Sequence, residues 1–137
     1  MRENEPEPKI REGASEGGCR LTPEAFGARL HRVTLHGCKL DAVNFRDAEL
    51  AEVVFDNCLL REVDFTGATL TRTSLAGCRL AGTTFTRTTL DQVDLRGAEL
   101  GITTDATSLR GAIVTSAQLT AMAPVLAESI GIVVDDG

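Results

Sequence analysis

Apolar side chains recur at every fifth position through the middle of the chain. Fifteen consecutive pentapeptides carry Leu or Phe at the same place, without a gap. Two residues before each of them lies a small or β-branched residue, and the other three positions are mostly polar. The large residues are Leu30, Leu35, Leu40, Phe45, Leu50, Phe55, Leu60, Phe65, Leu70, Leu75, Leu80, Phe85, Leu90, Leu95 and Leu100.

A period of five fits neither regular element, because a helix repeats every ~3.6 residues and a flat strand every ~2. Positions two apart on an extended segment point the same way. Each pentapeptide therefore sends one large and one small side chain inward, and the chain turns before the next pentapeptide begins. The pattern predicts an all-β solenoid with flat sides, whose units bury their apolar residues only by stacking.

A spacing of 20 residues makes the inward positions uniform. Two of the resulting columns are Phe45, Phe65, Phe85 and Cys38, Cys58, Cys78. A coil of this length with four pentapeptide sides places like residues above like, at the strand spacing of about 4.8 Å. The fifteen in-phase units therefore predict a little under four coils.

The ends of the repeat predict other structures. Residues 1–18 are rich in Glu, Pro and Gly and predict a disordered tail, followed by an N-terminal cap at 19–27. The solenoid is expected over residues 28–119. Its phase slips by one residue at 101–108, where we expect a loop to absorb the difference before the motif returns at Leu109.

The apolar spacing then becomes helical. Leu119, Met122, Leu126 and Ile130 follow spacings of 3, 4 and 4 residues, which predicts a helical cap over 116–131 and a tail at 132–137. An open solenoid end presents unpaired backbone groups. The helix is therefore expected either to cover that end or to join it to a second copy, as a homodimer.

Local signals mark the bounds of this helix. Thr115 and Gln118 have the spacing of a capping box, and Gly131 is a stop signal. Pro124 is expected to divide the segment into two short helices or to start the second one.

The charges of the repeat nearly balance, although the whole chain carries a net charge of −6. Several opposite charges are separated by one coil length, as Arg29 and Glu49 are, and are expected to stack as pairs. No basic patch or aromatic platform suggests direct nucleic-acid binding. No apolar run is long enough to span a membrane, and the N-terminus lacks the apolar run of a signal peptide, so we expect a cytoplasmic protein.

No set of residues predicts catalysis, a cofactor or a metal site. The cysteines at 38, 58 and 78 follow the coil spacing instead of a ligand spacing, so they are expected to pack inward as thiols, whereas Cys19 precedes the repeat and is expected to be exposed. Val54 and Leu59 occupy outward positions that are polar elsewhere. On adjacent sides of one coil, they are a candidate partner patch.

The repeat resembles the pentapeptide-repeat family, whose motif appears here as Ala48-Glu49-Leu50, Ala68-Thr69-Leu70 and Ala98-Glu99-Leu100. The resemblance covers about Ala28 to Leu119 and implies a right-handed quadrilateral β-helix with a short C-terminal α-helical cap. It also implies that C-terminal helices can mediate dimers.

Two functions follow from the resemblance and the residues together. The first is a non-catalytic, rigid protein–protein interaction module with an unidentified protein partner. The alternative is a DNA-mimicking modulator of DNA gyrase, as in the quinolone-resistance members of the family. Those members resemble longer, strongly acidic rods, whereas this repeat is short and nearly neutral, which favours the interaction module.

Overall fold

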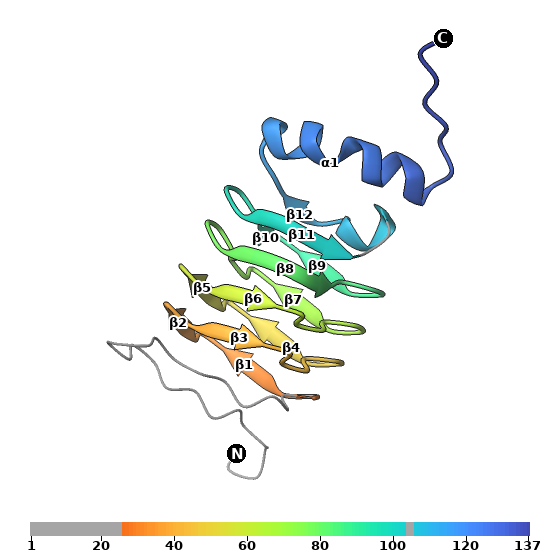
Figure 1. The fold of residues 1–137 in the computed structure, drawn as a ribbon. Helices are drawn as coiled ribbons and strands as arrows, with labels where there is room; N and C mark the ends of the chain where they lie inside the picture. Colours follow the sequence, from red (N-terminus) through yellow and green to blue (C-terminus); the bar gives the residue numbers. More distant parts are fainter. Residues whose placement is uncertain (1–25, 104–105) are drawn as a thin grey trace.

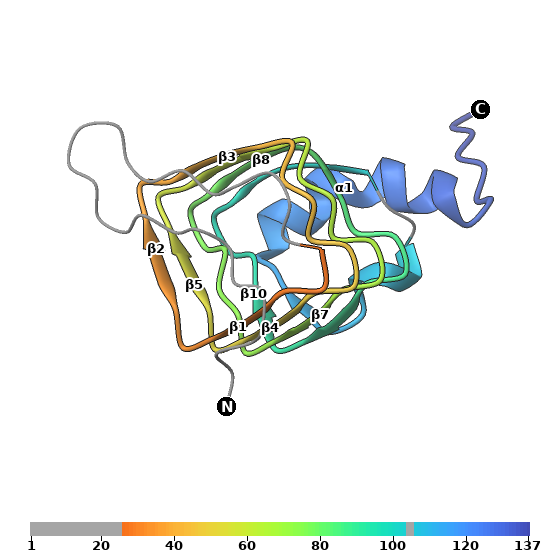
Figure 2. The same ribbon diagram turned by 90° about the horizontal axis from the view of Figure 1, so that it is seen from below.

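The chain winds into a stack of coils with a helix across one end (Figure 1). The computed structural model describes residues 26–103 and 106–137. Seen along the stack, each coil is a rounded square (Figure 2). Neighbouring coils pair in parallel and in register, so that Leu30 aligns with Leu50 and Leu50 with Leu70. The predicted quadrilateral solenoid is confirmed, and residues 1–25, with the expected tail and most of the expected cap, lie outside the described part.

Each side of the square is a narrow parallel sheet. The first side holds β1 (Arg29–His31), β4 (Glu49–Ala51), β7 (Thr69–Thr71) and β9 (Thr89–Asp91). The second holds β2 (Thr34–His36), β5 (Val54–Asp56), β10 (Val93–Asp94) and β12 (Ala112–Ile113), with a bridge at Ser74. The third holds β3 (Lys39–Asp41), β6 (Leu59–Arg61), β8 (Arg79–Thr84) and β11 (Glu99–Thr103). Single bridges join Asn44, Asp64 and Thr84 on the fourth.

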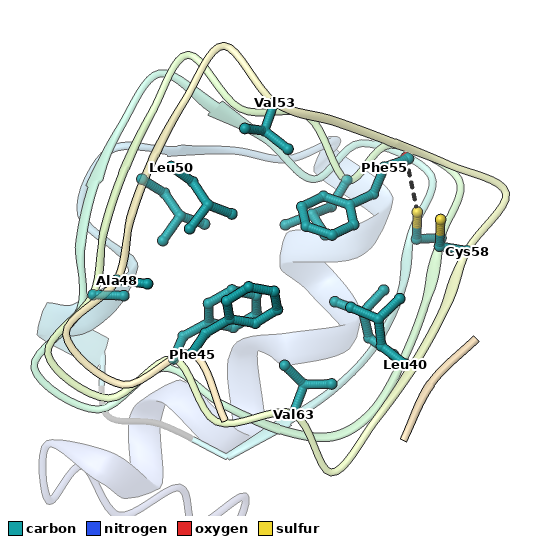
Figure 3. Close-up of a cluster of buried hydrophobic side chains, with 14 of the residues drawn as sticks. Leu40, Phe45, Ala48, Leu50, Val53, Phe55, Cys58 and Val63 are labelled. Carbon is teal, nitrogen blue, oxygen red and sulfur yellow. Dashed lines mark hydrogen bonds between the residues drawn. The ribbon is translucent and has the colours of Figure 1, made fainter. Parts of the chain in front are cut away.

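The core is a column of the residues that define the repeat. The large side chains from Leu30 to Leu95 are all buried, and Leu100 is half-buried. Figure 3 shows Leu40, Phe45, Leu50 and Phe55 pointing inward, one from each of the four sides. Phe45, Phe65 and Phe85 stack with ring centroids 5.2 Å apart and nearly parallel planes. Each buried Leu or Phe contributes roughly 1.5–3 kcal/mol, which chain entropy largely offsets.

Small inward residues with a donor group form an internal ladder of hydrogen bonds. The Sγ of Cys78 donates to the carbonyl of Phe55 at 3.0 Å, drawn as the dashed line in Figure 3. The Oγ1 of Thr88 donates to the carbonyl of Phe65 at 2.8 Å. In each case the donor lies 23 residues after the acceptor, slightly more than one coil. The inward position therefore links coils through side chains as well as through the backbone.

The cysteine column is more varied than its spacing predicts. Cys58 and Cys78 are buried free thiols, as expected. The neighbouring Cys78 thiol and burial raise the pKa of Cys58, so Cys58 stays protonated at neutral pH. Cys38 is instead disulfide-bonded, which its inward packing position did not predict. Cys19 lies outside the described residues.

The phase slip occurs inside a strand and not in a loop. β11 pairs with β8 in the regular register as far as Gly101, which lies opposite Ala81, but Ile102 then lies opposite Thr83, so the separation shortens by one residue. Val93 and Ala112 pair in the same shortened register. The expectation of a loop starting at Gly101 is therefore wrong, because β11 extends to Thr103. The 3-10 helix η2 (Ala106–Leu109) follows.

A single helix, α1 (Ser116–Ser129), lies across the C-terminal end of the stack (Figure 1). The expectation that Pro124 divides this segment is wrong, because Pro124 lies inside the continuous helix. Pro124 and Thr120, whose carbonyl Pro124 leaves without a backbone donor, are both exposed, so water can hydrate that carbonyl. The capping box of Thr115 and Gln118 is present as predicted. Among the described residues, no helix is long and apolar enough to cross a membrane.

Close contact between the last two coils depends on Gly111. A Cβ added there would collide with the carbonyl oxygen of Leu90 on the coil below, whereas a Cβ added at Gly77 would meet nothing. Both glycines have positive φ. Gly111→Ala is expected to lower the free energy of unfolding by about 3 kcal/mol, and the control Gly77→Ala by about 1 kcal/mol, from backbone strain alone. Urea unfolding measures both, and equal losses would contradict this account.

Candidate functional site

The C-terminal end carries an apolar surface that the fold leaves uncovered. No residue of α1 is buried. Leu119, Val125 and Ile130 are each more than half exposed, and the chain then continues into Ile132, Val133 and Val134, of which Val133 is 86% exposed. We call these six residues the C-terminal apolar surface. Its position at the end of the stack makes it the strongest candidate interaction site among the described residues.

Two hollows separate α1 from the last coil. The larger, of about 220 Å³, is lined mainly by Leu100, Leu109, Met122, Val125 and Leu126. The second, of about 190 Å³, shares Leu109, Met122 and Leu126 and adds Leu119. Both linings are largely apolar. The helix therefore lies over the end of the solenoid without filling the space beneath it.

Gln118 fastens the start of α1 to the solenoid. Its Nε2 donates to the carbonyls of Leu95 at 2.7 Å and Ala98 at 2.9 Å. Its Oε1 accepts from the backbone N–H of Thr115 at 2.8 Å, while its own backbone N–H donates to the Oγ1 of Thr115. One side chain thus joins the helix cap to the last full coil. Gln118 follows Leu95 by the same separation that joins donor to acceptor in the internal ladder, so it forms the last rung of that ladder.

The four helix residues that the sequence predicts as a site have different surroundings in the structure. Met122 and Leu126 are half-buried and line both hollows. Leu119 lines only the smaller hollow and is half exposed. Ile130, the C-cap residue, lines neither hollow and is exposed. The helical spacing therefore identified a face of which only the middle packs against the solenoid.

Sequence reasoning missed Gln118 as a contact with the solenoid. A signal was present, because Gln118 lies one regular coil length after Ala98, at the inward small position of the original phase. The spacing from Ala98 to Gln118 was hard to see, because the apolar motif that returns at Leu109 follows the shifted phase and not the original one. Val125 was missed as well, because the helical spacing of the four predicted residues passes over it.

Val54 and Leu59 do not form one hollow. Val54, on β5, pairs with Thr34 and Ser74 and is 38% exposed. Leu59, on β6, is half-buried between Lys39 and Arg79 and lines a shallow hollow at the corner beside Asn57. Val54 does not line that hollow. The two residues face different sides of the coil.

Several charged side chains of the solenoid pair between coils. Arg61 lies 3.0 Å from Asp41, and Arg79 lies 3.3 Å from Glu99, as their spacing predicts. The hydrogen bond from Arg61 lowers the pKa of Asp41. Glu52 lies between Arg32 and Arg72, and hydrogen bonds from both lower its pKa. These pairs lie at the surface, so each adds little stability and chiefly balances charge.

Within residues 26–103 and 106–137, no group of His, Cys, Asp or Glu is arranged to hold a metal ion. His36 pairs with Asp56 at 2.8 Å on the outside of the solenoid.

Comparison with known proteins identifies the repeat. Residues 17–85 match the family model described as a pentapeptide repeat region. No curated protein matches the chain. A pentapeptide repeat protein from the thylakoid lumen of Arabidopsis thaliana is similar in structure, with 22% sequence identity and a TM-score of 0.49 over 74% of this chain and 78% of that one.

Two further solved structures are similar over parts of the chain. QnrB1, a plasmid-mediated fluoroquinolone resistance protein, is 21% identical with a TM-score of 0.42, over 85% of this chain and 65% of its own. HetL, involved in heterocyst differentiation regulation in the cyanobacterium Nostoc sp. strain PCC 7120, is 23% identical with a TM-score of 0.30, over 58% of this chain and 38% of its own.

The role of Gln118 can be tested with an almost isosteric change. Gln118→Glu keeps an oxygen for the N–H of Thr115 but removes the donors to the carbonyls of Leu95 and Ala98. We expect amide hydrogens of α1 to exchange at least about 10-fold faster, because two carbonyls lose their partner and a carboxylate faces them. Thr115→Ala, which removes only the cap, is the control and costs about 1 kcal/mol. Unchanged exchange in Gln118→Glu would show that Gln118 does not fasten the helix.

Proposed function

The chain belongs to the pentapeptide repeat family, and we propose that it is a non-catalytic, rigid protein–protein interaction module that binds a second copy of itself through its C-terminal end. One observation carries the proposal: α1 buries none of its residues, although most of them are apolar.

The composition of α1 supports a contact on both of its faces. From Ser116 to Ala127 the helix has no charged residue, and Glu128 is its only one. A helix that is apolar around most of its circumference is normally buried on all sides. Here the last coil covers one face only, and that face incompletely. A second copy that packs its own α1 against the exposed ends of this face, where Leu119 and Ile130 lie, would extend the burial.

The sides of the solenoid contrast with this end. Their outward positions are mostly polar, and their charges are largely paired from coil to coil. Val54 and Leu59 are separate apolar residues among polar neighbours. Scattered apolar residues of this kind are normal on protein surfaces. The sides therefore offer a weaker apolar driving force for association than the C-terminal end.

The pairing of charges also bears on the alternative of DNA mimicry. A protein that replaces DNA on an enzyme surface needs a row of unpaired negative charge, because phosphates are what that surface recognises. On this solenoid the acidic side chains Asp41, Glu52 and Glu99 each lie beside an Arg. The interaction module is therefore favoured over a gyrase modulator.

Self-association can be tested at exposed helix positions. The double variant Leu119→Gln, Ile130→Gln replaces side chains that are more than half exposed in the single chain, so its fold is expected to persist. We expect the dimer dissociation constant to rise at least about 30-fold, because the apolar contact is lost from both copies. Sedimentation velocity over a range of concentrations measures it, with Val54→Gln on the solenoid side as the matched control. A dimer of unchanged affinity would refute the proposed site.

The two functions predict different effects on DNA gyrase. We expect the purified protein, in large excess, neither to inhibit gyrase supercoiling nor to protect the enzyme from a quinolone, because Arg side chains lie beside several of its acidic residues, such as Asp41, Glu52 and Glu99. Supercoiling assays with and without the drug measure both effects. Inhibition or protection would instead establish a topoisomerase modulator.

A further inference from the structure

The tail that follows α1 is apolar and held away from its own solenoid. Gly131 has a φ of 85°, and the N–H of Ile132 donates to the carbonyl of Ala127 at 2.8 Å, which ends the helix and directs the chain outward. Figures 1 and 2 show the tail leaving the end of α1 and running away from the coils. Val133 and Val134 are 86% and 71% exposed. Two such side chains in sequence are costly to leave in water.

The tail does not fill the hollow beneath its own helix. Ile132 and Val134 border a shallow groove against Pro124 and Val125, away from the last coil. The hollow of about 220 Å³ lies between α1 and the coil, and no residue of the tail lines it. The molecule thus has an apolar hollow and an unburied apolar segment at the same end, but not in contact.

The charges beside the hollow and at the end of the tail are opposite in sign. Arg110 is the only basic residue after Arg96, and it directly follows Leu109, which lines both hollows. Arg110 is exposed and forms no ion pair with any described residue. Asp135 and Asp136 directly follow the apolar part of the tail. A segment of valines followed by two aspartates therefore matches an apolar hollow that has an arginine beside it.

The tail and α1 have similar lengths, which would allow two copies to exchange their tails. The six residues after Gly131 span at most about 20 Å when extended. The 14 residues of α1 are about 21 Å long. If two copies lie with their helices antiparallel, the tail of each starts near the beginning of the other helix, where Gln118 and Leu109 border the hollow. This arrangement is isologous and closes at two copies.

We propose that Ile132, Val133 and Val134 of one copy fill the hollow beneath α1 of a second copy, and that Asp135 and Asp136 pair with Arg110 of that copy. The inference rests on the self-association proposed above and names the segment that completes it. Each copy supplies one tail and one hollow, so both hollows are filled. Leu119 and Ile130 then form the remainder of the contact between the two helices.

The test measures the dimer dissociation constant of the full chain by sedimentation equilibrium. Val133→Asp is expected to raise it at least about 100-fold, because a charge replaces an apolar anchor in both copies. Val54→Asp, the same change on the solenoid side, is the matched control and is expected to leave it unchanged. Arg110→Glu is expected to raise it about 10-fold through repulsion of the tail aspartates. Adding Asp135→Arg and Asp136→Arg to Arg110→Glu is expected to restore the wild-type dissociation constant.

A photo-crosslinking residue at position 133 separates the remaining outcomes. In an equal mixture of ¹⁴N- and ¹⁵N-labelled protein, mixed-isotope crosslinks to peptides that contain Leu109 or Met122 are expected. Crosslinks within single isotopes only would place the tail in its own hollow and overturn the exchange. A dimer that Val133→Asp leaves intact but that Leu119→Gln, Ile130→Gln dissociates would refute the exchange and keep the proposed function. A wild-type chain that is monomeric at all concentrations would overturn both.

Discussion

The parallel pairing of coils in one fixed register is the constraint on which the rest of the structure depends. Each coil is too thin to bury its own Leu and Phe side chains, so burial exists only between coils that stay in register. Within the regular repeat, where the apolar motif keeps its phase, a shift by one residue would place polar side chains inside. The stacked rings of Phe45, Phe65 and Phe85 and the ion pairs outside both follow from this register.

The same constraint explains why the last coil of the repeat needs a cover. A regular coil can always receive another coil, and an exposed final coil would present unpaired backbone groups and half-buried residues such as Leu100. The chain stops the repeat in two steps. The register shortens by one residue after Gly101, and Gln118, at the start of the helix, then makes a ladder-type hydrogen bond to the carbonyl of Leu95. Gln118 therefore bonds the last full coil from within the first turn of the helix.

Much of the fold could be predicted because a strict repeat carries its own register, so the apolar columns, the stacked ion pairs and the helix cap follow from spacing alone. Other features depend on what surrounds a residue. Pro124 is tolerated because its side of the helix meets water, and spacing cannot reveal that exposure. Helical spacing likewise identified Met122 and Leu126 in the candidate site, but not the hollows that they line, because a hollow depends on how far the helix lies from the coil. The contact made by Gln118 was hidden because it follows the original phase, whereas the apolar motif has already shifted.

The difference between the sides and the end of the solenoid limits the assemblies that this chain can form. Paired charges and polar corners give the sides little drive to associate, whereas the C-terminal apolar surface gives the end a strong one. If a bare final coil joined the first coil of another molecule, the contact would be heterologous and would grow into a fibre. A helix across the end prevents that, because it replaces open backbone with apolar side chains. In the self-association proposed above, one partner satisfies the apolar end, so growth would stop at two copies.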